Sequence, residues 1–71
     1  MTTTTRTIAV IANVTGDQIA PDTALRDKMD SLDAVEVTMD LEEEFGIELD
    51  EEAVMQCATV ADLVKLVEAR M

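Results

Sequence analysis

The sequence contains no histidine, tryptophan or tyrosine, and it has only one cysteine, one proline and one phenylalanine. Without histidine, the chain cannot assemble Ser-His-Asp or Cys-His nucleophilic catalysis, and zinc sites built on Cys and His are effectively excluded. The single cysteine, Cys57, cannot form a disulfide within the chain, so nothing indicates an oxidising compartment. These absences argue against an enzyme.

The chain is also short and lacks a long hydrophobic run. Its 71 residues predict a single domain over residues 1–71, too small to enclose an active site with its own supporting shell. No run of about 20 apolar residues occurs, so no membrane span is expected. The start of the sequence lacks a convincing signal-peptide cleavage pattern, and we expect a cytoplasmic protein.

Cations are scarce, with 5 Lys and Arg against 16 Asp and Glu, which gives a formal net charge of −11. Nucleic acid and anionic membranes would be repelled by this charge, whereas a basic protein surface would complement it. The composition is 48% hydrophobic but only 1% aromatic, so the core must be built from Val, Leu, Ile, Met and Ala.

The clearest predicted helix covers residues 31–45, with Asp30 or Ser31 as its cap and Gly46 just after its end. One face at helical spacing is expected to enter the core. Its residues are Ala34, Val37, Thr38, Leu41 and Phe45. A second apolar stripe consists of Leu32, Val35 and Met39. The pattern alone does not decide whether that stripe widens the buried face or forms an exposed contact patch.

The other segments carry weaker signals. Residues 3–14 fit a strand by their β-branched content and a helix by the spacing of their apolar residues, and these two interpretations stay nearly even. Residues 17–30 read as a long loop, residues 50–58 as a short helix, and residues 59–62 as a capping box that opens a last helix. The last helix has apolar residues at helical spacing: Val60, Leu63, Val64 and Val67.

Three features could carry chemistry. Eleven carboxylates lie between Asp30 and Glu52 with no Lys or Arg among them; they form either a solvated face or a recognition surface for a basic partner, and they lack the spacing of a calcium loop. Ser31 reads locally as a helix cap, although a phosphodiester at a helix start would be stabilised by the helix dipole and free N–H groups. Cys57 has no His or Lys near it in sequence and is expected to be a small buried apolar group.

The stretch from Asp30 to Val37, which begins Asp30-Ser31-Leu32-Asp33, and the stretch from Met39 to Leu49 closely resemble bacterial acyl carrier proteins. The Asp-Ser-Leu motif, the helix after it and its Glu-Glu-Glu-Phe end match that family in register. Similarity continues downstream and covers roughly residues 19–67.

The resemblance implies an all-α fold, a small four-helix bundle with three long helices and one short helix after a long first loop, and it favours a helix over residues 3–14. It implies that Ser31, with Asp30 beside it, receives 4′-phosphopantetheine from coenzyme A through a phosphopantetheinyl transferase. The arm would then hold acyl groups as thioesters for enzymes with basic docking patches, on a monomeric, non-catalytic carrier. The helix face that such partners read is implied to comprise Leu32, Asp33, Val35, Glu36, Met39, Glu42 and Glu43.

The sequence departs from the family pattern just before the serine. The family has a Leu-Gly pair where this chain has Asp27-Lys28-Met29, which also places a cation near the prosthetic-group site. We therefore expect a specialised carrier of fatty acyl, polyketide or related cargo, rather than the housekeeping fatty-acid carrier. The alternative is an acidic helical interaction module that is never modified.

Overall fold

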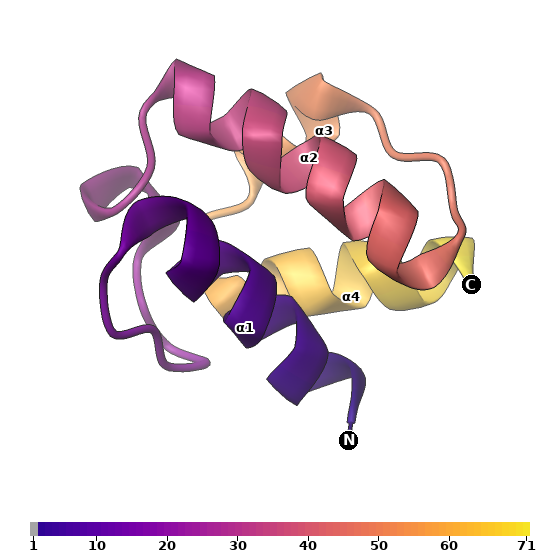
Figure 1. Ribbon diagram of the computed structural model, residues 1–71, viewed down its shortest axis with the longest axis horizontal. Coiled ribbons are helices and arrows are strands. Elements are labelled where there is room, and N and C mark those ends of the chain that lie inside the picture. Colours follow the sequence, from indigo (N-terminus) through magenta and orange to yellow (C-terminus); the bar gives the residue numbers. More distant parts are fainter. Residues whose placement is uncertain (1) are drawn as a thin grey trace.

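A computed structural model describes residues 2–71, which form four α-helices and one short 3₁₀ helix (Figure 1). The helices are α1 (Thr3–Thr15), α2 (Ser31–Phe45), α3 (Glu51–Gln56) and α4 (Val60–Arg70), and the 3₁₀ helix η1 covers Leu25–Asp27. Helix α1 packs against α2 and α4, and α3 packs against α2 and α4. The expected all-α fold with three longer helices and one short helix is confirmed. None of the helices in the described residues has the length and hydropathy needed to cross a membrane.

Helix α1 resolves the ambiguity of residues 3–14. The Thr2 side chain caps its start by accepting a hydrogen bond from the Thr5 N–H, and Gly16 ends it at φ 74°, a left-handed conformation that glycine adopts without a steric penalty. Thr7 and Ile11, four residues apart, are buried on one face. Burial of that face against α2 and α4 outweighs the β-propensity of the threonines, valines and isoleucines, because such propensities are strongly context-dependent.

Helix α2 begins and ends where the sequence predicts. Asp30 is the cap: its carboxylate accepts the Asp33 N–H at 2.8 Å, and the Asp33 carboxylate accepts the Asp30 N–H in return. Gly46 ends the helix at φ 65° and donates its N–H to the Glu42 carbonyl. Four of the five predicted core residues are buried, namely Ala34, Val37, Thr38 and Leu41, whereas Phe45 is only partly buried.

Helices α3 and α4 complete the core. Helix α3 is shorter than the helix expected over residues 50–58, because Asp50 and Cys57 are its caps rather than helical residues. Thr59 and Asp62 form the predicted capping box of α4. The fully buried side chains are aliphatic apart from Thr7, and the largest are Ile11, Leu41, Leu63, Val37, Val54, Val60 and Val67.

The long loop between α1 and α2 is tied to the start of α4. The Leu25 N–H donates to the Ala58 carbonyl at 2.9 Å, and the Val60 N–H donates to the Thr23 carbonyl at 3.1 Å. Leu25 itself is inserted into the core, with 2% of its surface exposed. These contacts hold η1 opposite the connection between α3 and α4.

Candidate functional site

Ser31 lies at the first position of α2 and is exposed. Since the cap is Asp30, the serine hydroxyl is not used to close the helix, and it has no hydrogen-bond partner among residues 2–71. The backbone N–H groups of Ser31 and Leu32 are likewise free of partners in the described chain, because the first bonds at this end are made by Asp33 and Ala34. The site therefore presents a free hydroxyl beside two N–H donors at the positive end of a 15-residue helix.

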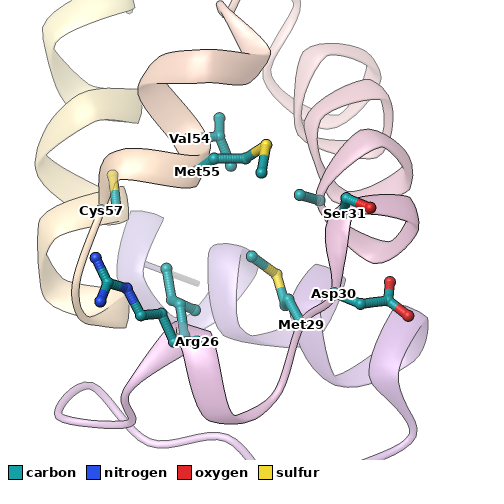
Figure 2. Close-up of a pocket in the computed structure, with 9 residues that line it drawn as sticks. Arg26, Met29, Asp30, Ser31, Val54, Met55 and Cys57 are labelled. Carbon is teal, nitrogen blue, oxygen red and sulfur yellow. The ribbon is translucent and has the colours of Figure 1, made fainter.

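A pocket of about 200 Å³ lies beside Ser31, between η1, the start of α2 and α3 (Figure 2). Most of its wall is apolar. The lining residues are Leu25, Arg26, Met29, Asp30, Ser31, Ala34, Val54, Met55 and Cys57. Figure 2 shows the Ser31 hydroxyl and the Asp30 carboxylate on the outer side of the wall, while Met29 and Met55 extend into the space between η1 and α3.

Most residues of this pocket carry no signal in the sequence. Arg26, Val54 and Met55 come from η1 and α3, which the loop contacts described above bring to the start of α2. The sequence offers only a weak signal for it, namely apolar residues such as Ile19 and Leu25 within a polar loop, which is the pattern of a loop anchored in the core. Lys28, the cation singled out from the sequence, does not line the pocket, whereas Arg26 does.

Cys57 lies at the pocket wall and is partly buried. Its thiol is 3.4 Å from the Ala53 carbonyl oxygen, which accepts its hydrogen bond. Burial raises the pKa of the Cys57 thiol, and the nearby Asp62 carboxylate raises it further. The thiol is therefore held in its protonated form, which is a poor nucleophile, and this agrees with the expected packing role.

The residues predicted to contact partners do not form one uniform surface. Leu32 and Met39 are strongly exposed, at 77% and 60%, and Glu36 and Glu43 are exposed with them on α2. The second apolar stripe is thus an exposed patch at Leu32 and Met39, while Val35 is half-buried.

Two of the predicted carboxylates already have hydrogen bonds within the chain. The Asp33 carboxylate closes the capping box of α2, and the Glu42 carboxylate accepts the Leu49 N–H at 2.9 Å. Glu43 also faces a second hollow between α1 and α2, together with Val10 and Asn13. The exposed centre of the surface is therefore formed by Leu32, Glu36, Met39 and Glu43.

The acidic residues of α2 and α3 do not gather into a metal site. Among residues 2–71 no group of three or more Cys, Asp or Glu side chains is arranged to hold a metal ion. The one ion pair within this range joins the Arg6 guanidinium to the Glu44 carboxylate at 2.8 Å, with the guanidinium 4.3 Å from the centre of the Phe45 ring. Most carboxylates of α2 and α3 consequently face solvent without a cation beside them.

Comparison with known proteins relates the whole core of the chain to one family. The family described as "Phosphopantetheine attachment site" matches residues 4–67. A chain of the solved structure titled "The ishigamide ketosynthase/chain length factor" superposes with a TM-score of 0.80 at 22% identity, over 94% of this chain and 90% of that chain. At this level of identity the superposition supports the fold alone.

Curated relatives match at higher identity over a shorter segment. Acyl carrier protein from Prochlorococcus marinus (strain MIT 9515) is 56% identical over 41 residues, which is 58% of this chain and 51% of that protein. Acyl carrier protein 1, chloroplastic, from Casuarina glauca is 56% identical over 39 residues, which is 55% of this chain and 29% of that protein. The matched segment thus spans about half the length of these relatives or less.

Proposed function

The chain belongs to the phosphopantetheine attachment family, and on this premise we propose that it is an acyl carrier protein whose Ser31 bears the prosthetic group. The family's prosthetic group is 4′-phosphopantetheine, held covalently. Its terminal thiol would hold acyl groups as thioesters while they pass between biosynthetic enzymes. The protein itself supplies no catalytic group in this proposal.

The observation that carries the proposal is the free hydroxyl of Ser31 at the start of α2. Ser31 is the only serine of the chain, it is exposed, and its hydroxyl is not engaged within the described residues. A phosphodiester formed there would lie next to the unpartnered N–H groups of Ser31 and Leu32, which stabilise negative charge at a helix start. The residues present therefore fit the group.

The modification requires only an accessible oxygen from this chain. The Ser31 oxygen would form a bond to the phosphorus that carries the pantetheine arm of coenzyme A. Adenosine 3′,5′-bisphosphate would leave, and the hydroxyl proton would be lost to the transferase or to solvent. Asp30 keeps α2 capped throughout, because its carboxylate is bonded to the Asp33 N–H. The helix start is thus held in place independently of the serine.

The partners would be a phosphopantetheinyl transferase and acyl-transferring or synthase enzymes with basic docking patches. Four exposed residues of α2 support this: Leu32 and Met39 offer apolar contact beside the attachment point, and Glu36 and Glu43 offer negative charge. Charge complementarity would mainly accelerate encounter, and the two apolar side chains would contribute to affinity. We place the carrier in fatty-acid or polyketide synthesis as a specialised member.

The test is intact mass after incubation with coenzyme A and a broad-specificity phosphopantetheinyl transferase. The wild type should gain one phosphopantetheine, and Ser31→Ala should gain none. Because Asp30 rather than Ser31 caps α2, the variant should keep its far-ultraviolet circular dichroism and melting temperature.

A gain by Ser31→Ala would place the attachment elsewhere. Absence of any gain in the wild type, both with this transferase and after expression in cells of the source, would contradict the carrier role. That result would favour an unmodified acidic interaction module.

A further inference from the structure

On the premise of the carrier function above, we propose that Arg26 is a specificity-determining residue: its guanidinium binds a keto or carboxylate oxygen of an acyl group that enters the pocket beside Ser31. The pocket would accordingly favour oxygenated acyl groups over plain hydrocarbon chains.

The position of Arg26 is the first part of the argument. Arg26 is the middle residue of η1 and lines the pocket together with Ser31. In Figure 2, Arg26 and Cys57 lie across the pocket from Ser31 and Asp30. Arg26 is exposed, and its guanidinium lies beside Cys57 at the rim of the pocket, so a group that starts at Ser31 and crosses the pocket meets it at the far rim.

The free donors of Arg26 are the second part. The chain has 16 carboxylates, yet the guanidinium of Arg26 forms no ion pair and no hydrogen bond with any residue in the range 2–71. Arg6, by contrast, is bonded to both the side chain and the backbone carbonyl of Glu44. The thiol of Cys57, on the same side of the pocket, donates its hydrogen bond to the Ala53 carbonyl and not to Arg26. Its planar set of five N–H donors is thus available to an incoming oxygen.

The exposed guanidinium makes this arrangement selective for an acyl group that carries an acceptor. An alkyl chain in the pocket would leave the guanidinium of the exposed Arg26 in water and would offer it no acceptor. An acyl group with a keto or carboxylate oxygen would replace that water with a charge-assisted hydrogen bond. Met29, Val54 and Met55 would contact the carbon chain in either case.

The pocket has a volume of about 200 Å³, so a short acyl group is the suitable probe of Arg26, and a six-carbon chain is used.

The experiment compares two cargoes on three proteins. Wild type, Arg26→Met and Lys65→Met are each converted to the phosphopantetheine form and loaded with a hexanoyl or a 5-oxohexanoyl group, with loading checked by intact mass. Arg26→Met keeps a long side chain without the charge. Lys65→Met removes one cation from an exposed position on α4 that does not line the pocket. The readout is the rate at which hydroxylamine cleaves the thioester, divided by the rate for the same acyl group on free pantetheine.

In the wild type, the 5-oxohexanoyl thioester should be cleaved about 2- to 10-fold more slowly than the hexanoyl thioester, the factor expected for one net hydrogen bond. The ratio should persist in Lys65→Met and fall to about one in Arg26→Met. A ratio of one in the loaded wild type, or a ratio that survives Arg26→Met, would overturn the assignment of Arg26 and leave the carrier function intact. Failure of loading would show instead in the mass spectrum; together with absence of modification in cells of the source, it would overturn the carrier function and this proposal with it.

Discussion

Thr7 of α1 places a hydroxyl in the core without a partner. The residue has no exposed surface, and its hydroxyl makes no hydrogen bond with any of the residues 2–71. A buried hydroxyl in this state costs about 1–3 kcal/mol of desolvation. Thr7→Val replaces the hydroxyl with a methyl group of similar shape, so we expect the free energy of unfolding to increase by about 1–3 kcal/mol.

Thr38 of α2 is the matched control. It is also buried, with 5% of its surface exposed, but its hydroxyl donates to the Ala34 carbonyl at 2.7 Å. Thr38→Val loses a net hydrogen bond of about 0.5–1.5 kcal/mol and gains a buried methyl group of about 0.8 kcal/mol. The two effects nearly cancel, so the stability of this variant should stay close to that of the wild type.

The assay is urea unfolding of the unmodified protein, followed by circular dichroism at one fixed salt concentration. For a domain of this size, each kcal/mol should also raise the melting temperature by about 4–8 °C. An unchanged slope of free energy against urea would confirm that the variants differ in stability alone. If Thr7→Val is no more stable than Thr38→Val, the Thr7 hydroxyl has a partner, such as a buried water or a carbonyl of its own helix, and the reasoning is wrong.

Two further predictions concern charge. The chain has 16 carboxylates and 5 cations, and only one ion pair occurs within residues 2–71, so the carboxylates repel one another. Added NaCl or MgCl₂ screens this repulsion and should raise the melting temperature. A melting temperature that does not change from about 0.01 to 0.1 M salt would contradict this. Burial and Asp62 raise the pKa of Cys57, so the folded state holds the thiol proton more tightly than the unfolded state. The stabilisation that the protonated thiol gives the folded state is complete below the unfolded pKa of about 8.5 and is lost as pH rises through the folded pKa. The free energy of unfolding should therefore decline above about pH 8.5 less steeply in Cys57→Ala than in the wild type. Equal slopes against pH in alkaline urea titrations would refute this.

The helices with strong local signals could be predicted almost residue by residue. Asp30 and Gly46 bound α2 as expected, and the Thr59–Asp62 capping box opens α4, because caps and left-handed glycines act within a few residues of the chain. Helix α1 could not be assigned from its own residues. The helix becomes more favourable than the strand only when α2 and α4 are present to cover Thr7 and Ile11.

The predicted core of α2 was correct for four of five positions, and the reason for the exception is tertiary. Phe45 lies at the last turn of α2, where its ring packs against the edge of the core and under the Arg6 guanidinium of α1, so it is only partly buried. The role of the second stripe was likewise open. Leu32 and Met39 remain exposed because no other helix within residues 2–71 covers that side of α2.

The sequence by itself determined helix α2, with Ser31 at its start, and the acidic surface, since both follow from composition and from contacts between near neighbours along the chain. The all-α class was implied by the resemblance to acyl carrier proteins. Only the tertiary structure decided the pocket. Arg26, Val54 and Ser31 are brought to it from η1, α3 and α2, and the hydrogen bonds that hold η1 in place join residues more than 30 positions apart. The physical reason is that such contacts depend on how the helices pack, which no local pattern encodes.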